Sequence, residues 1–476
     1  MKRVLLFILL LSSLLSFSQD QYSNSQTSKP VLELVKQIAE ENILMDSAVG
    51  GAGMRPKQYD SFEKLKNKAT LKELRALTNH PNGVVRCYAL QGLILNKENS
   101  DTIFSIIKKH LNDDEIIETF SGCIMEDQLV SDVFLGYTRY PLTYVNEKPI
   151  LSEKQTKDLD SLIIYNGNKR SWYRHLAIYK LAATPQNYPI VKSIAINEGF
   201  ESALVKLSEY HREEDLDFLY NQYDSLNSKN YMAVYYEIAA NYAHPKFFPL
   251  LSSAFKDQFD NNSLDRYETA KLYDAVASYK NNASLELLSI PFTDIKDADK
   301  RRIHLNYTEE AIIKYNDKIY DDLLWKLWKE YDILSHNGYA YLKNLYPEKT
   351  FTLSVKNLKK QGDSHIDSGL MTIILNDIYK KEPKFIHSLV INGIEEDTTN
   401  KFFVYLDFAE SKKDYVPSML KRLEREADHY RYMSIVRVLI GFNDSKINRK
   451  ILEIKKSNPN MDNIELDNLL DEHGIH

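Results

Sequence analysis

An aromatic residue followed by a short polar turn recurs at steps of 31 to 37 residues through much of the second half of this chain, with a last double step of 63 residues that spans two units. Between these turns, apolar residues recur at spacings of three and four, which places them along one side of a helix. A period of this length is typical of repeat architectures, in which one helix pair cannot bury its apolar face alone and must stack on its neighbours. The sequence therefore predicts an all-α fold, an α-α superhelix (solenoid) of drifted helical pairs. The repeated aromatic residues are Tyr210, Tyr242, Tyr279, Tyr315, Tyr346, Tyr379 and Phe442.

Composition agrees with a helical array. The 476 residues include only 15 Gly and 14 Pro, too few for the turns of an all-β protein, and 43% are hydrophobic, which is unlike a disordered chain. The run Phe402–Tyr405 suits a strand by propensity, but it falls where the period requires a helix. We therefore predict a helix there, and strand-like alternation is nearly absent elsewhere.

The clearest unit lies between Thr70 and Asp114. A first helix ends with Leu71, Leu74 and Leu77, and Asn79–Gly83 forms a polar turn. A second helix follows from Val84, and the next is expected from Asp101 to Leu111. The unit is thus read as helix, turn, helix.

This unit resembles a HEAT-like repeat, in which the turn often carries Asp or Asn-Pro, followed by Val-Arg and a small residue that allows close helix contact. Weaker echoes occur at Tyr173–Ala177 and Ile435–Arg437, whereas Glu118 takes the place of the arginine in the second unit. A tetratricopeptide unit fits the period but not its expected Trp, Gly, Ala and Pro positions. The resemblance implies a fold and no activity. The matching residues are Asn79, Pro81, Val85, Arg86 and Ala89.

The first residues have the pattern of an export signal. Lys2 and Arg3 form a basic start, an apolar stretch runs from Val4 to Leu15, and small residues follow up to Ser18. We therefore expect cleavage before Gln19 and an exported, periplasmic or secreted, protein. No later segment is long and apolar enough to span a bilayer, so the mature chain is expected to have no transmembrane segment.

Net charge argues against nucleic acid as a partner. The formal charge is −6, and removal of Lys2 and Arg3 makes it −8. A mildly acidic net charge disfavours broad binding to nucleic acid by neutralisation of its phosphates. We expect no binding to nucleic acid.

We divide the chain into residues 1–18 as a signal peptide, 19–58 as a leader and 59–470 as the helical array. The leader comprises a first helix over Val31–Met45 and a glycine-rich loop. An irregular stretch at 137–150 interrupts the array. It is either an insertion that carries binding specificity or a drifted repeat with a poor turn.

Two motifs invite a chemical reading and have a structural alternative. The glycines of Val49–Gly53 lack the preceding strand and following Gly-Lys-Ser or Gly-Lys-Thr of a phosphate-binding loop, so a flexible connector is favoured. Asp363, His365 and Asp367 could form a metal or acid/base site, but also suit a turn that caps the next helix, which we favour. The tail residues His473 and His476 could share a metal only if they were helical, which Gly474 disfavours.

Cysteines and aromatic residues also allow two interpretations. Cys87 and Cys123 could form a disulfide between neighbouring helices of an exported protein, or be two small buried thiols, the reading that we favour. The aromatic sets Tyr231, Tyr235 and Tyr236, or Trp325 with Trp328, could form a ligand platform, but their spacing favours the core.

The sequence shows no zinc-protease helix, no nucleophile elbow and no closely spaced cysteine pair. It assigns no catalytic, cofactor-binding or metal-binding residue and implies no cofactor. We expect a non-catalytic interaction or scaffold protein of the bacterial envelope or secreted space that binds a protein or peptide partner on the solenoid surface. The alternative is an accessory module that binds or processes cell-envelope glycan, with an enzyme as the third possibility.

Overall fold

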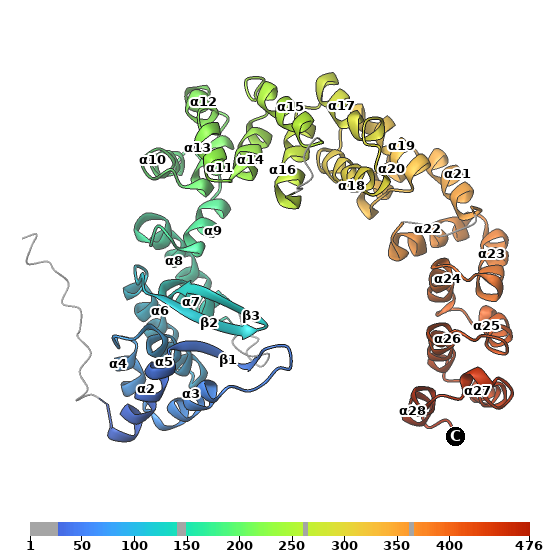
Figure 1. Cartoon of the computed structure of the whole chain (residues 1–476), viewed down its shortest axis with the longest axis horizontal. Coiled ribbons are helices and arrows are strands. Elements are labelled where there is room, and N and C mark those ends of the chain that lie inside the picture. The colour runs from blue at the N-terminus through green and yellow to red at the C-terminus, as the bar shows by residue number, and fades with distance from the viewer. Residues whose placement is uncertain (1–26, 140–148, 260–264, 361–365) are drawn as a thin grey trace, which may run out of the picture. The chain divides into compact units, whose positions relative to one another are not determined.

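The computed structural model describes residues 27–139, 149–259, 265–360 and 366–476. The chain divides into two units, the first ending at Leu219 and the second beginning at Tyr220. Helices make up most of both units (Figure 1), so the predicted all-α class is confirmed. The signal-peptide prediction, together with Asp363, His365 and most of the irregular stretch at 137–150, falls outside the described residues.

The first unit contains helices and three strands. In chain order they are α2 (Lys29–Glu41), β1 (Ile43–Val49), α3 (Lys57–Lys68), α4 (Leu71–Leu77), α5 (Gly83–Leu95), α6 (Ser100–Lys109), β2 (Ile116–Gly122), β3 (Ile124–Leu129), α7 (Val130–Arg139), α8 (Glu153–Asn166), α9 (Trp172–Lys180), α10 (Tyr188–Glu198), α11 (Glu201–Ser208) and α12 (Glu213–Tyr220), which ends at the boundary.

The described residues of the second unit form helices and no strands. Its elements are α13 (Tyr223–Ser228), α14 (Met232–Tyr242), α15 (Phe248–Asp257), α16 (Arg266–Ala277), α17 (Asn282–Ser289), η2 (Ile290–Phe292), α18 (Ala298–Tyr315), η3 (Lys318–Tyr320), α19 (Asp321–Tyr331), α20 (His336–Leu345), α21 (Pro347–Leu358), α22 (Ser368–Lys381), α23 (Pro383–Glu396), α24 (Lys401–Ala409), η4 (Lys413–Tyr415), α25 (Val416–Leu423), α26 (His429–Gly441), α27 (Ser445–Ser457), η5 (Pro459–Met461) and α28 (Ile464–Glu472).

The repeated aromatic turns have a common backbone form. The residue after Tyr210, Tyr242, Tyr279, Tyr315 or Phe442 has a positive φ, between 43° and 52°. A left-handed residue just past the last turn is a common way for a helix to end, because the amides that follow can then satisfy the free carbonyls. The repeat recognised in the sequence is therefore a repeated helix C-terminus. The left-handed residues are His211, Ala243, Lys280, Asn316 and Asn443.

Neighbouring helices of the second unit pack in sequence. Helix α14 packs on α16 and α16 on α18, and further along α22 packs on α24 while α23 packs on α25, which gives two rows of helices (Figure 1). The run Phe402–Tyr405 lies inside α24, as predicted from the period. Stacking of this kind explains how a long chain forms many small cores in place of one large core.

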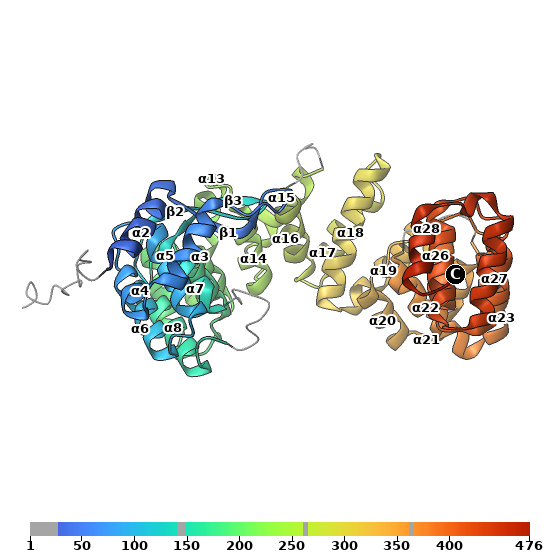
Figure 2. The ribbon, with the colours of Figure 1, turned by 90° about the horizontal axis from the view of Figure 1, so that it is seen from below.

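The first unit differs from the prediction, because it contains a mixed three-stranded sheet. Strand β1 pairs in parallel with β2, which pairs antiparallel with β3, and the strands lie along one side of α3, α5 and α7 (Figure 2). The predicted helix over Val31–Met45 is wrong at its end. Helix α2 ends at Asn42, whose φ of 53° reverses the chain, and the following residues form β1. Glu118, expected in a second helical unit, lies in β2.

Helix α5 fixes the sheet on the helices. Its residues from Gly83 to Ile94 are all buried, and Asn82 caps its first turn. Gly83 lies where a side chain would collide with Ile117 of β2 and Val130 of α7, at 2.7 and 2.8 Å from an added Cβ. Its amide donates to Glu115 just before β2, at 2.8 Å. This close approach sets the starts of β2 and α7 against the start of α5.

Candidate functional site

A groove with a volume of about 940 Å³ lies wholly in the first unit. Four consecutive residues of β3, from Glu126 to Leu129, line it. Because consecutive strand residues point to opposite faces of a sheet, the groove borders both faces of β3 and so reaches its outer edge. It also extends over β2 and β1, where Thr119–Ser121 and Leu44 line it. The opposite wall comes from α7 and the start of α9. The other lining residues are Leu44, Asp46, Gln91, Ile116, Thr119, Phe120, Ser121, Asp132, Val133, Gly136, Tyr137, Arg170, Trp172 and Tyr173.

The other edge of the sheet is closed by side chains. The phenol of Tyr88 accepts from the amide of Met45 at 2.9 Å and donates to the carbonyl of the same residue at 2.8 Å. The side-chain amide of Gln58 donates to the carbonyl of Ile43 at 3.1 Å. Three backbone groups of β1 that point away from β2, both of Met45 and the carbonyl of Ile43, are therefore already satisfied.

Strand β3 has no such cover from the described residues. The amide of Val130 donates to the carbonyl of Glu115 at 2.9 Å, which makes these two residues a hydrogen-bonded pair of the β2–β3 ladder. Hydrogen-bonded and non-hydrogen-bonded pairs alternate along an antiparallel ladder. The backbone groups of Glu126 and Gln128 consequently face β2, whereas those of Met125 and Asp127 point outward. No hydrogen bond to the backbone of Met125 or Asp127 is formed by any residue in the described ranges.

The far wall is held by a partly buried carboxylate. Asp132 of α7 accepts from the hydroxyl of Ser171 and, at 2.8 Å, from the amide of Trp172, so it caps the first turn of α9. Partial burial raises the pKa of Asp132 in spite of these hydrogen bonds. The arrangement leaves 65% of Trp172 exposed, whereas Tyr173 next to it is buried. An indole surface is thus presented to the groove on a rigid support.

The charge of the groove is unbalanced. Asp46, Glu126, Asp127 and Asp132 line it, and Arg170 is its one cation among the described residues. Asp46 accepts from Ser121 and Glu126 from Gln128, which are neutral partners. None of the four carboxylates is in an ion pair with a described residue. The groove therefore combines unpaired backbone groups, an exposed aromatic ring and net negative charge.

The described residues include no group of three or more His, Cys, Asp or Glu side chains that could hold a metal ion. The side chain of Asp367 accepts from the amide of Leu370 at 3.1 Å and so caps α22, as the sequence suggested. In the tail, His476 pairs with Asp471 at 3.1 Å. The loop at Gly50 and Gly53 is a tight turn with positive φ at both residues. The prediction that no strand precedes this loop is wrong, because β1 ends at Val49.

The cysteine and aromatic predictions hold in part. Cys87 and Cys123 are free, and Cys87 is buried, but Cys123 is exposed between β2 and β3 because its segment forms a hairpin and not a helix. Trp325 and Trp328 are buried, as their spacing indicated. Tyr231 is wrong as a core residue, since 49% of it is exposed just before α14.

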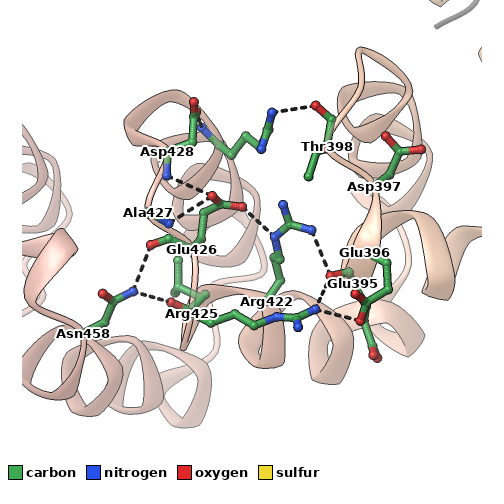
Figure 3. Close-up of polar contacts among 12 residues, drawn as sticks. Glu395, Glu396, Asp397, Thr398, Arg422, Arg425, Glu426, Ala427, Asp428 and Asn458 are labelled. Carbon is green, nitrogen blue, oxygen red and sulfur yellow. Dashed lines mark hydrogen bonds and ion pairs between the residues drawn. The ribbon is translucent and has the colours of Figure 1, made fainter. Parts of the chain in front are cut away.

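A dense polar cluster in the second unit is structural. Arg422 of α25 donates to Glu426 at 2.6 Å and to the carbonyl of Glu395, at the end of α23, at 2.9 Å (Figure 3). Glu426 accepts in turn from the amides of Ala427 and Asp428. Both charged side chains are buried, and they bond to each other and to backbone groups, as expected of a structural contact.

The same arrangement recurs in the first unit. Arg86 donates to the carbonyls of His80 and Pro81 at 2.7 and 2.8 Å and pairs with Asp113 and Glu115. A buried arginine that joins a preceding helix end to a following carboxylate is thus a shared packing device. Arg174 does the same with the carbonyl of Ile164 and the carboxylate of Glu198. Arg437, which belongs to the weaker echo of the unit at Ile435–Arg437, does not join a helix end to a carboxylate. Arg422 makes these contacts in that part of the chain.

The groove could not be predicted from the sequence, because the groove is built on strands that the sequence did not predict. The residues of β3 carry no regular alternation of apolar and polar side chains, so their period gives no strand signal. The Gly122-Cys123 corner was the only local sign of a hairpin.

Comparison with known proteins adds no assignment. No family model matches the chain, and no curated protein or solved structure does either. Among the described residues, no helix combines the length and apolar character needed to cross a bilayer.

Proposed function

We propose that this protein is a non-catalytic interaction protein that binds an extended segment of a partner protein in the groove beside β3. The observation that carries this proposal is the difference between the two edges of the sheet. Side chains cover backbone groups on the outer edge of β1, whereas the amides and carbonyls of Met125 and Asp127 of β3 have no partner among the described residues, and Asp127 lines the groove. Addition of a strand to such an edge is a recurring mode of peptide recognition, because the main chain supplies affinity and the side-chain pockets supply specificity.

The dimensions suit a peptide. The six residues of β3 extend about 20 Å at roughly 3.4 Å per residue. The groove beside them has a far wall with one exposed aromatic ring, Trp172, on which an extended chain can pack.

The proposal is tested with fluorescently labelled ten-residue peptides of high strand propensity that differ in charge. Hydrogen exchange followed by mass spectrometry should show that a bound peptide slows exchange in the segment that contains Met125 and Asp127, and leaves the segment of β1 unchanged. If none of the peptides changes exchange at β3, strand addition is excluded.

A backbone variant supplies the matched test. Met125→Pro removes an amide that points away from β2, so no hydrogen bond between β2 and β3 is lost. Proline is tolerated at such positions of an edge strand. Met125→Ala removes the side chain and keeps the amide. We expect peptide binding about tenfold weaker for Met125→Pro and a smaller change for Met125→Ala, with the helical circular dichroism of both like that of the wild type.

We also propose that the array consists of drifted HEAT-like pairs and that the chain is exported after cleavage near Ser18. The shared role of Arg86 and Arg174 supports the first proposal, because arginine at this place was the hydrogen-bonding position of the resemblance. The basic start and apolar run that end at Ser18 support the second. The intact mass of protein recovered from the envelope or medium tests export, and a mass of 55.4 kDa contradicts it.

A glycan ligand is the second candidate, favoured by the exposed ring of Trp172 among polar side chains. The chain has 3 tryptophans, and Trp325 and Trp328 are buried. A glycan that stacks on Trp172 should therefore change the fluorescence of that residue alone. Titration with soluble peptidoglycan fragments checks this, and Trp172→Phe should remove the change.

A further inference from the structure

We infer that the β3 groove selects a partner segment with two adjacent basic residues, followed or preceded by apolar residues. This inference rests on the proposed function and names the chemistry of its partner. It follows from the side chains along β3 and from their lack of cationic partners among the described residues.

The order of side chains on β3 gives the pattern. Glu126 and Asp127 are consecutive and exposed, and each would lie opposite one residue of an added strand. Cross-strand pairs of opposite charge are favourable and pairs of like charge are unfavourable. Two adjacent Lys or Arg residues meet both carboxylates, one on each face of the extended sheet. Ile124 and Met125, which are 65% and 52% exposed, continue the strand and suit apolar partners.

The other acidic side chains around the groove add to the negative charge of Glu126 and Asp127. Asp46 and Asp132 line the groove as well, and Arg170 is its one cation within the described ranges. A cleft lined by charge of one sign raises the local concentration of ligands of the other sign. The exposed ring of Trp172 can accept a Lys or Arg side chain on its face in addition to apolar groups.

The same two acids argue against a second copy of this chain as the occupant. Outward-pointing residues must face outward-pointing residues in an antiparallel pair of β3 strands. Two registers of such a pair keep most of the residues of both strands in contact. One of them places Glu126 opposite Glu126, and the other places Asp127 opposite Asp127. Charged residues on an edge strand prevent pairing of this kind. The edge is therefore closed to itself and open to a basic strand.

The experiment compares three labelled ten-residue peptides that differ only in two central residues, Lys-Lys, Ser-Ser or Glu-Glu, within a background of Val and Thr. Fluorescence anisotropy at low salt should rank the affinities as basic, neutral and acidic, with about tenfold between the first two. The preference should shrink at high salt, because exposed charges are then screened.

Charge reversal gives the decisive variant. Glu126→Lys with Asp127→Lys should invert the ranking, so that the acidic peptide binds most tightly. Glu33→Lys is the matched control, an exposed acid of α2 outside the groove, and should leave the ranking unchanged. Circular dichroism and the thermal midpoint verify that each variant is folded.

The outcomes separate this inference from the proposed function. If all three peptides bind equally and protect Met125 and Asp127 from exchange, strand addition stands and the selection of basic residues is wrong. If the ranking is basic, neutral and acidic but the charge-reversed variant does not invert it, the acids of β3 are not the cause and the inference also fails. If no peptide protects β3, both fail.

Discussion

Arg86 holds three parts of the first unit together. Its guanidinium joins the turn before α5 to the segment before β2, through two carbonyls and two carboxylates, and only 7% of the residue is exposed. The pKa of Asp113 is lowered by hydrogen bonds from His110 and by the charge of Arg86, against the effect of its own burial. Every partner of this arginine would lose a charge-assisted hydrogen bond if it were removed.

We expect Arg86→Ala to destabilise the protein by about 3–5 kcal/mol, because it leaves the carboxylate of Asp113 partly buried without its cation. Arg55→Ala is the control. Arg55 pairs with Asp60 at 2.7 Å, but both side chains are about half exposed, so a loss of about 0–1 kcal/mol is expected. Chemical denaturation of both variants checks this, and equal losses would contradict the role given to Arg86.

His304 of α18 is a buried histidine in the second unit. It has no exposed surface, and its Nδ1 lies 2.8 Å from the phenol of Tyr273. The aromatic rings of Phe259, Tyr273 and Tyr307 pack against its imidazole. Burial, with a smaller effect of the nearby Lys300, lowers the pKa of His304 to about 4.

The lowered pKa predicts a loss of stability in acid. The unfolded chain binds the proton near pH 6.5, whereas folded His304 stays neutral until about pH 4. The stability contributed by the neutral imidazole is present above pH 6.5 and is lost as the pH falls through this window, by up to about 3 kcal/mol. His304→Gln should flatten the pH dependence of the unfolding free energy between pH 6.5 and 4. An unchanged slope relative to the wild type would disprove this contribution.

At the level of elements, close helix contacts depend on single glycines. A Cβ added at Gly393 of α23 would lie 2.1 Å from the Cδ2 of Tyr405 in α24, so these helices meet closely only because the side chain is absent. Gly92 of α5 is also inside a helix, but its nearest neighbour, Leu74, would be 3.4 Å away. The two positions share their helical backbone and differ in available space.

We expect Gly393→Ala to destabilise the protein by about 1–3 kcal/mol, because overpacking outweighs the gain in helix propensity. Gly92→Ala should be neutral or stabilise by up to about 1 kcal/mol, since an exchange of Gly for Ala favours a helix. Thermal unfolding of the two variants in parallel tests the prediction. A comparable loss in both would show that the contact with Tyr405 is not the cause.

The two edges of the sheet show how elements divide structural and binding roles. Tyr88 and Gln58 lie on helices α5 and α3 and use their polar groups to finish β1. Strand β3 lies on the other side, where the groove that it borders is also lined by residues of α7 and of the start of α9. The edge is available because no helix of the described chain packs on it.

For the whole molecule, the division at Leu219 and Tyr220 is the main feature. Helices in a stacked array contact mainly their neighbours, so stability is close to a sum of local terms. We expect residues 27–219 and 220–476, expressed separately, each to give a helical circular dichroism spectrum and a cooperative unfolding transition. The first fragment should retain the peptide affinity of the full chain. An unfolded fragment would show that the two units depend on each other.

The sequence determined the helical array by itself, because helices are built from contacts between residues three and four apart. The periodic apolar residues of α14 and α19, the cap of α22 by Asp367 and the aromatic turns with their left-handed residues all act over one or two helical turns. The sheet, the groove and the exposure of Cys123 were decided only by the tertiary structure. Strand β1 is hydrogen-bonded to β2, where Ile43 pairs with Glu118. On its outer edge, the backbone of Met45 is bonded by the side chain of Tyr88. Partners so distant along the chain leave no periodic trace, since each strand is stable only after the helices between them have brought it into register.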